Sequence, residues 1–288
     1  MRYAIFLGCT VPARLKHYEV SSRAILEKMD IELVDIPEFI CCGYPLRNFD
    51  FMSFLLSSAR NLALAKRDGL DIITLCKCCF GSLKKAEYFL KNEPALRREI
   101  NDILNKENLN LDGSIVIKHI LSVLYHDIGI DALKEMITKP YNDVKIATHY
   151  GCHALRPSEV VQFDDPANPS IFDQLVEVTG AKSIHWHSRL ECCGAPVMGI
   201  NDNLSMDITE KKLIDGQESG ADYLCVACSY CQLQFDKVQK IMVSDRNIDN
   251  SLSSILYPQL LGLSMGIDAE TLQLGMNELD ITELQNCI

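Results

Sequence analysis

The chain has 288 residues, of which 48% are hydrophobic, so it can form one large domain or two medium ones and is not a low-complexity disordered protein. It carries 28 Lys and Arg against 39 Asp and Glu, a net charge of −11, which argues against a general nucleic-acid binder because Lys and Arg supply the contacts to phosphate. The first residues lack the charged head, apolar segment and cleavage site of a secretion signal. We therefore expect a cytoplasmic protein.

The first half of the chain alternates short β-type runs with helical patterns. Strands are expected over residues 3–7, 31–36 and 72–75, and helices over residues 17–29 and 51–67. This alternation predicts an α/β unit with a small, largely parallel sheet flanked by helices.

Five cysteines follow one spacing in this half. With 31 and 33 residues between successive groups, they are Cys9, the pair Cys41 and Cys42, and Cys76 with Cys79. Cys9 lies just past an expected strand, and Cys76 lies at a strand-to-helix turn. Ligands of parallel α/β sheets bind outside the carboxyl ends of the strands, so we expect one metal-binding cluster at this edge.

The second half repeats this order. Strands are expected over residues 144–148, 182–185 and 223–226, and helices over residues 206–219 and 230–243. With 39 and 34 residues between successive groups, the cysteines here are Cys152, the pair Cys192 and Cys193, and Cys228 with Cys231.

The agreement between the halves extends beyond cysteine. A glycine precedes the first cysteine of each set, the sequence Cys-Cys-Gly-x-Pro occurs at residues 41–45 and 192–196, and Gly-Ile-Asp occurs at residues 129–131 and 266–268. The chain is therefore predicted to be a tandem duplication, with repeats over residues 1–142 and 143–288. Pro140 and Asn142 supply the chain-breaking residues at the joint.

An uncharged run over residues 250–267 is long enough to span a membrane, but it contains Pro258, Gly262 and four serines. Insertion would therefore cost too much, and we expect a buried helix and no membrane insertion. The net charge lies in the second half, since residues 1–143 hold 19 basic and 19 acidic side chains and residues 144–288 hold 9 and 20. The acidic tail after Ile267 is either simply solvated or docks on a basic electron-donor subunit.

The thirteen cysteines indicate metal ligation, because a chain without a secretion signal is not expected to build a disulfide framework. Zinc takes four ligands, and an ordinary cubane iron–sulfur cluster also takes four cysteines. Each half offers five, including an adjacent pair that does not easily occupy neighbouring corners of one cubane. An unusual cluster in each half is the favoured interpretation, with structural zinc sites and buried structural thiols as the alternatives.

The duplicated pattern resembles the cysteine-rich CCG domain pair of the catalytic B subunit of heterodisulfide reductase, over essentially the whole chain. The resemblance implies two tandem pseudo-symmetric CCG repeats that hold two noncubane 4Fe-4S clusters near the interface between the repeats. It assigns the ligands as Cys9, Cys41, Cys42, Cys76 and Cys79 for one cluster and Cys152, Cys192, Cys193, Cys228 and Cys231 for the other.

The resemblance also implies an activity and partners. In that family a disulfide is split between the two clusters, each of which delivers one electron to one sulfur. This sequence has neither a Gly-x-Gly-x-x-Gly fingerprint nor a ferredoxin-type cysteine run. Electrons are therefore expected from a ferredoxin-like C subunit attached to a flavin-containing A subunit.

Histidines and arginines near the cysteines are candidates for further roles. Of the four histidines around the second motif, His153 and His187 are the candidates for donating a proton to a departing thiolate. Arg14 and Arg156 each follow a first cysteine and are candidates for binding an anionic substrate group, with surface ion pairing as the alternative.

Three cysteines lie outside the template. Cys78 lies inside the first Cys-x-x-Cys and Cys225 lies three residues before the second, so either can replace a neighbouring ligand by a small shift of its loop. The alternative for both is a buried small residue. Cys287 is interpreted as a free thiol in the tail.

The sequence therefore predicts the disulfide-reducing, cluster-bearing subunit of a cytoplasmic oxidoreductase complex, similar to the B subunit of heterodisulfide reductase. Whether its substrate is the methanogenic heterodisulfide or a bacterial disulfide stays open. Two alternatives remain: an electron-transfer subunit of a complex that oxidises a 2-hydroxy acid such as glycolate or lactate, and a metal-stabilised scaffold.

Overall fold

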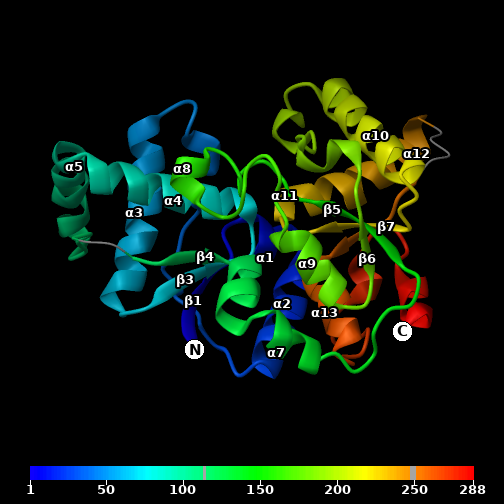
Figure 1. The fold of residues 1–288 in the computed structure, drawn as a ribbon. Coiled ribbons are helices and arrows are strands. Elements are labelled where there is room, and N and C mark those ends of the chain that lie inside the picture. Colours follow the sequence, from blue (N-terminus) through cyan, green and yellow to red (C-terminus); the bar gives the residue numbers. More distant parts are fainter. Residues whose placement is uncertain (113–114, 247–250) are drawn as a thin grey trace.

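The computed structural model describes residues 1–112, 115–246 and 251–288, and it contains two four-stranded sheets whose strands are all parallel (Figure 1). The first sheet has the order β2-β1-β3-β4 and the second the order β6-β5-β7-β8. The strands are β1 (Arg2–Phe6), β2 (Glu32–Val34), β3 (Asp71–Thr74), β4 (Ile117–His119), β5 (Lys145–His149), β6 (Lys182–Ile184), β7 (Tyr223–Val226) and β8 (Ser254–Leu256). Each sheet takes its strands from one half of the chain, which confirms the predicted α/β fold with two repeats.

Helices lie between the strands and cover the sheets. They are α1 (Thr10–Arg14), α2 (Lys16–Lys28), α3 (Phe51–Arg67), α4 (Lys77–Asn92), α5 (Pro94–Leu104), α6 (Ile120–Ser122), α7 (Ile130–Glu135), α8 (Ser158–Val161), α9 (Ile171–Val178), α10 (Asp202–Glu218), α11 (Ser229–Gln232), α12 (Gln239–Arg246) and α13 (Tyr257–Ser264). The helix expected over residues 230–243 is divided among α11, a π-helical segment Leu233–Val238 and α12.

The long helices α3 and α10 begin in the same way. The side chain of Asp50 accepts a hydrogen bond from the Ser53 N–H at 3.0 Å, and Asn201 accepts one from the Leu204 N–H at 3.1 Å. These N-caps satisfy backbone donors that have no partner within the helix. Because each helix follows a Cys-Cys-Gly segment, the caps fix the position of that segment in both halves.

Two strands were not expected from the sequence, and one segment differs from its prediction. β4 and β8 are three-residue edge strands that pair in parallel with β3 and β7. The expected buried helix over residues 250–267 is wrong in its extent, because β8 occupies part of that run and only α13 is helical, although α13 is buried along its whole length. Residue 250 lies outside the described residues.

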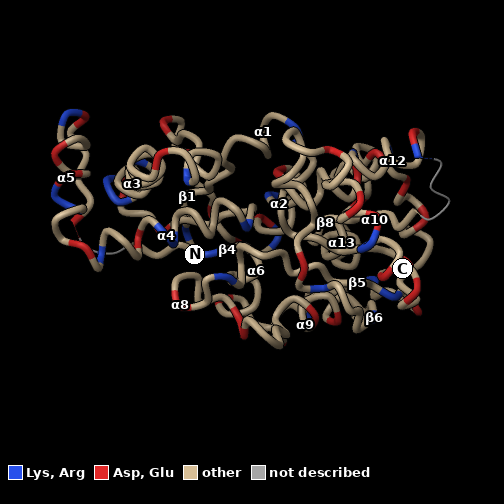
Figure 2. The backbone as a smooth tube through the Cα atoms, turned by 90° about the horizontal axis from the view of Figure 1, so that it is seen from above, with Lys and Arg blue, Asp and Glu red and all other residues tan. Residues whose placement is uncertain are grey.

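The two halves pack closely against each other. α2 of the first half lies against α13 of the second, where a Cβ on Gly262 would lie 3.3 Å from the Ile25 side chain. Nearby, the Lys28 ammonium donates to the carbonyl of Met265 at 2.8 Å. Figure 2 shows Asp and Glu around α9, α12 and the C-terminus, which agrees with the excess of acidic residues in the second half. Among the described residues, no helix is long and apolar enough to cross a membrane.

Candidate metal centre

The first-half cysteines gather where β1 and β3 end. These are the two central strands of the sheet, and the order of the connections reverses between them, which is where open α/β sheets bind ligands. Cys9 follows β1, and its sulfur lies 3.8 Å from the sulfur of Cys41. Cys76 follows β3 and is the N-cap residue of α4, so that Cys79 is buried in the first turn of this helix.

The second-half cysteines occupy the same places beside β5 and β7. Cys152 follows β5, and Cys228 is the N-cap residue of α11. The backbone N–H of Gly194 donates to the sulfur of Cys192 at 3.4 Å. Ligand atoms of His149, Cys193 and Cys231 all lie within 4.8 Å of one another. In each half, cysteines of the template therefore lie around the ends of the two central strands.

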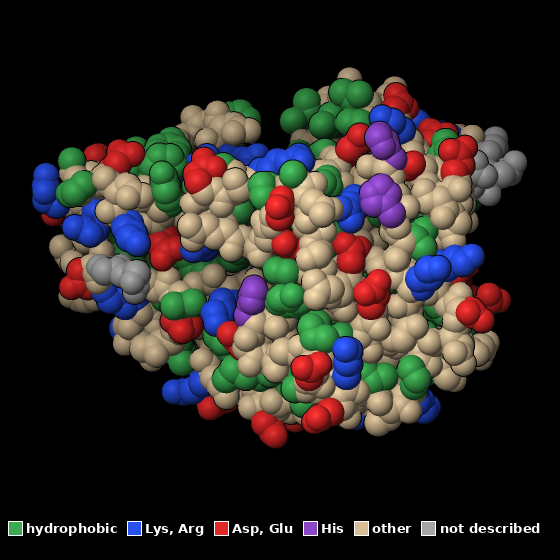
Figure 3. All heavy atoms as spheres, viewed as in Figure 1, with side chains coloured by type: hydrophobic (Ala, Val, Ile, Leu, Met, Phe, Trp, Pro, Cys, Tyr) green, Lys and Arg blue, Asp and Glu red, His purple; other side chains and the backbone are tan. Residues whose placement is uncertain are grey.

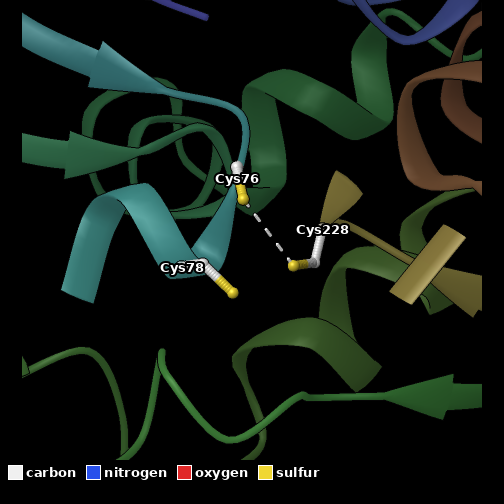
Figure 4. A group of neighbouring side chains, drawn as sticks. All are labelled: Cys76, Cys78 and Cys228. Carbon is white, nitrogen blue, oxygen red and sulfur yellow. Dashed lines mark hydrogen bonds between the residues drawn. The ribbon is translucent and has the colours of Figure 1, made fainter. Parts of the chain in front are cut away.

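The two sets meet between the halves. Figure 4 shows Cys76 and Cys78, at the start of α4, facing Cys228 from the second half. The sulfurs of Cys76 and Cys228 are 3.9 Å apart, and the three sulfurs lie within 4.8 Å of one another. The N-terminus of α4 points its free N–H groups toward this junction and favours negative charge there.

Each Cys-Cys-Gly segment is held against the helix that follows it. Gly43 has φ 79° and Gly194 has φ 93°, a left-handed conformation that favours glycine. A Cβ on Gly43 would lie 2.8 Å from the Phe54 carbonyl oxygen, and one on Gly194 would lie 2.6 Å from that of Ser205. These glycines are therefore required both for the turn and for the close approach of the cysteine pair to its helix.

Matching hydroxyl groups hold the cysteine backbones. Ser58 on α3 donates to the carbonyl of Cys42 at 2.6 Å, and Thr209 on α10 donates to the carbonyl of Cys193 at 3.1 Å. The second cysteine of each pair is therefore fixed by the same kind of contact, and both side chains are buried.

The donor set fits a thiolate-bound metal or iron–sulfur group. All thirteen cysteines are free thiols, and thiolates are the ligands that select zinc and iron–sulfur clusters. His149 lies beside Cys193 and Cys231, and both of its ring nitrogens are buried without a hydrogen-bond partner among the described residues. Buried polar atoms of this kind require a partner, and a group bound by the neighbouring cysteines meets that need.

Hydrogen bonds between neighbouring thiols favour a thiolate at one sulfur in each group. Contact with Cys152 lowers the pKa of Cys192 to about 2, and contact with Cys41 lowers the pKa of Cys42 well below 9.0. Contact with Cys193 raises the pKa of Cys231 well above 9.0. Each further thiolate therefore needs a cation beside it, so metal binding and proton release are coupled.

His153 lies between the two sets. Its Nδ1 is 3.3 Å from the sulfur of Cys152 and 3.5 Å from that of Cys78. Its Nε2 is 2.8 Å from Nη1 of Arg47, and its ring meets that of Tyr44 edge-on with centroids 5.0 Å apart. Burial, with a smaller effect of Arg47, lowers the pKa of His153. Because Arg47 can only donate, Nε2 accepts and the proton of the neutral ring lies on Nδ1, facing the sulfurs.

The remaining candidates lie elsewhere. His187 is exposed in a short helical turn, Arg14 is exposed at the end of α1, and Arg156 is exposed in the loop after Cys152. No described contact joins these three to a cysteine, and their roles stay predictions. Cys225 is fully buried in β7, where it pairs with Thr148 in the sheet.

Several residues at the site were not predicted from the sequence. Tyr44 and Arg47 are in the first-half Cys-Cys-Gly loop but contact His153 of the second half, and nothing in the sequence indicates that crossing. Two buried lysines, Lys77 and Lys212, also lie beside the second set. The only available signal was the position of Lys77 inside the Cys-x-x-Cys motif.

Comparison with known proteins places these features in context. The model of the cysteine-rich domain family CCG matches the chain twice, over residues 3–84 and 146–236. The B subunit of the ferredoxin/F420H2-dependent CoB-CoM heterodisulfide reductase of Methanosarcina acetivorans is 35% identical over 286 residues, 98% of this chain and 95% of the relative. The 8-methylmenaquinol:fumarate reductase membrane anchor subunit of Wolinella succinogenes is 30% identical over 283 residues, 98% of each chain.

A solved structure supports the fold. The crystal structure of a hypothetical protein from Helicobacter pylori matches with a TM-score of 0.76 at 20% sequence identity, covering 98% of this chain and 52% of that one.

Proposed function

Because the chain belongs to the cysteine-rich CCG domain family and, within it, to the heterodisulfide reductase B subunits, we propose that it is the catalytic iron–sulfur subunit of a heterodisulfide-reductase-like complex that reduces a disulfide to two thiols. The family relationship makes it an iron–sulfur oxidoreductase subunit. The observation that carries the proposal is the meeting of the two cysteine sets, with the sulfurs of Cys76 and Cys228 3.9 Å apart.

Two noncubane 4Fe-4S clusters are the proposed cofactors, held by the ten template cysteines. When bound, each supplies one electron to one sulfur of the disulfide. The reaction consumes two electrons and two protons, breaks the S–S bond and forms two S–H bonds. The adjacent cysteine pairs support the noncubane type, because each half provides five template thiols where a cubane needs four.

His153 is the proposed catalytic histidine at the junction. Its Nδ1–H faces the sulfurs of Cys78 and Cys152, and the Arg47 contact holds the ring in that tautomer. A thiolate formed between the two sets would accept a hydrogen bond from this N–H. His187 is the second proposed proton donor, and Arg14 and Arg156 are the proposed anion-binding residues; their exposure leaves them accessible to a substrate.

A hollow at the top of the molecule is the proposed place of substrate entry. Figure 3 shows it, with Lys or Arg side chains on its floor. Positive charge at such a place suits a disulfide that carries anionic groups.

Partner subunits are proposed to supply the electrons, namely a ferredoxin-like C subunit and a flavin-containing A subunit. Phe49 is 90% exposed and Ile200 is 85% exposed, and they lie at matching positions in the two Cys-Cys-Gly loops. Large exposed apolar side chains beside a redox site support the docking of another subunit. We place the complex in the cytoplasm, where the free thiols stay reduced.

Metal analysis and turnover test the proposal together. Protein reconstituted anaerobically with iron and sulfide should hold roughly eight irons and eight sulfides per chain, with spectra unlike those of a cubane. With a low-potential dye as electron donor it should release two thiols from a disulfide. Stoichiometric zinc with no iron would support the scaffold instead. Oxidation of glycolate or lactate, with no thiol release, would support a subunit of a 2-hydroxy-acid oxidoreductase.

A further inference from the structure

The residues after Cys76 and Cys228 occupy matching positions, and each reaches into the opposite half. Ser229 is fully buried, and its hydroxyl donates to the sulfur of Cys76 at 3.1 Å. Lys77 is 1% exposed, and its ammonium donates to the carbonyl of His149 at 3.2 Å. The first-half site therefore receives a neutral hydroxyl from the second half, and the second-half site receives an ammonium group from the first.

A second pair of matching positions also has a neutral residue in the first half and a lysine in the second, and here each residue contacts its own half. Asn61 on α3 and Lys212 on α10 lie at the same distance in sequence from their helix N-caps, Asp50 and Asn201. The Asn61 amide donates to the carbonyl of Cys41 at 3.2 Å. Lys212, also 1% exposed, donates to the carbonyls of Ser188 and, at 3.4 Å, Glu191. The neutral residue again lies beside the first set of cysteines and the lysine beside the second.

Among the residues that the structure describes, neither lysine has a carboxylate partner. No salt bridge within 4.0 Å joins Lys77 or Lys212 to an acidic side chain in the part of the chain that is described. Their ammonium groups instead lie 4.7 Å from the ring centroids of Phe172 and Trp186, respectively. Rings and carbonyl groups only partly offset the cost of burying a cation.

Both lysines lie close to the second set of cysteines. Lys77 lines the same small cavity as Cys152, Cys193, Cys228 and Cys231. The Glu191 carbonyl that Lys212 contacts directly precedes the pair Cys192 and Cys193. Burial disfavours the ammonium form of each lysine. A thiolate-bound anionic group at the second-half cysteines would offset the two buried cations.

We propose that Lys77 and Lys212 place two positive charges beside the second-half cluster, so that this cluster takes up its electron at a higher potential than the first-half cluster. This inference rests on the proposed function and deepens it. Uptake of one electron from a one-electron donor adds one negative charge to the cluster, and nearby buried cations stabilise the reduced form. The two halves of a duplicated site thereby become unequal, and the second-half cluster is the first to be reduced.

An EPR-monitored redox titration of the reconstituted chain tests this inference. Lys77→Met and Lys212→Met each remove one charge at nearly constant volume. The matched control is Lys211→Met on the same helix, whose side chain is 69% exposed. In both buried-lysine variants the higher-potential step should move to lower potential while the other step stays in place. The control should leave both steps unchanged, because solvent screens the charge of Lys211.

Two further variants assign the steps to the halves. Cys152→Ala should remove the higher-potential step, and Cys9→Ala should remove the lower-potential one.

The inference would be overturned if neither lysine variant changed a reduction potential. It would also be overturned if Lys77→Met shifted one reduction step and Lys212→Met shifted the other. If one lysine variant fails to assemble its clusters, the potentials of the other variant still test the inference. Loss of iron from both would also count against it, because the lysines would then be needed to assemble the site. Failure of the proposed function looks different: the wild-type chain would hold no iron or release no thiols, whatever the titration shows.

Discussion

At the scale of single residues, Cys78 and Cys225 are the two buried cysteines that the template leaves out. Their surroundings differ. The sulfur of Cys78 lies within 4.8 Å of those of Cys76 and Cys228 and 3.5 Å from His153 Nδ1. Cys225 is enclosed within β7, and burial raises the pKa of its thiol. The first belongs to the junction of the two cysteine sets, and the second belongs to the core of a sheet.

Substituting these two cysteines should therefore give different outcomes. Cys78→Ala should change the spectrum of the reconstituted protein and lower its iron content. Cys225→Ala should leave iron and spectrum as in the wild type and reduce the free energy of unfolding by about 1 kcal/mol, as expected for a small loss of buried volume. Iron analysis, visible spectra and denaturation measure these effects. Equal iron loss in both variants would contradict the assignment.

A buried histidine makes the stability dependent on pH. Neutral His119 uses both ring nitrogens, since Nε2 donates to the carbonyl of Leu75 at 3.2 Å and Nδ1 accepts from the N–H of Leu121 at 3.3 Å. Burial lowers its pKa from 6.5 to about 3. The unfolded chain therefore binds more protons in this window, so stability is fully present above about pH 6.5 and is lost as the pH falls toward 3.

His119→Gln should weaken this dependence, because an amide can make both hydrogen bonds without titrating. From His119 alone, the wild type should lose about 2 kcal/mol of unfolding free energy between pH 7 and pH 5. Chemical denaturation of both proteins at the two pH values measures the difference. Other buried histidines contribute equally to both proteins, so parallel pH profiles would show that His119 does not titrate on unfolding.

At the scale of elements, α4 carries the junction. Cys76 is its N-cap residue, and the helix packs against the loop that holds His153. A Cβ on Gly81 of this helix would lie 2.8 Å from the carbonyl oxygen of His153, closer than backbone atoms can tolerate. The absence of a side chain at Gly81 therefore sets how closely the two halves approach.

Gly81→Ala should push α4 away from that loop and change the spectrum of the bound clusters, even though alanine favours helix formation. The matched control is Gly216→Ala in α10, where the added methyl meets the flexible end of the Leu252 side chain at 2.7 Å and not backbone. The control should keep the wild-type spectrum. Spectra and iron content measure both, and an unchanged Gly81→Ala spectrum would show that the halves can adjust.

Some strands could be predicted from the sequence and others could not. The central strands were predictable because β1, β3, β5 and β7 are short β-type runs, mostly buried, each followed within a few residues by a cysteine. β4 was not, because its three residues include Lys118 and His119, which become acceptable in a strand only through tertiary partners such as Asp127. β8 lies within a continuous uncharged run, and periodicity alone does not distinguish a short buried strand from a buried helix in such a run.

Part of the site could likewise be predicted from the sequence, and part could not. Its cysteines were predictable because duplication repeats their spacing. The contacts of Lys77, Ser229 and His153 were not, because each crosses to the other half and depends on how the halves pack.

At the scale of the whole molecule, the two sites should act jointly on one substrate. Cys9→Ala and Cys152→Ala should each abolish disulfide cleavage while the opposite cluster is retained, because each sulfur needs its own electron. A diffusible low-potential dye should not restore activity in either variant. Thiol release and iron content are the measurements, and full rescue of either variant by the dye would indicate a serial relay in place of joint action.

Lys77 and Ser229 occupy matching positions, yet each brings a different group to the opposite half. This difference requires both repeats to be in one chain. A symmetric dimer of one repeat would carry the same residue at both positions, because identical chains present identical surfaces to each other. Two lysines or two serines would then face the two sites equally. Joining two copies in one chain lifts this restriction, since each copy can change alone. A fused chain can therefore place different charges beside its two matching centres, whereas a homodimer of one repeat cannot.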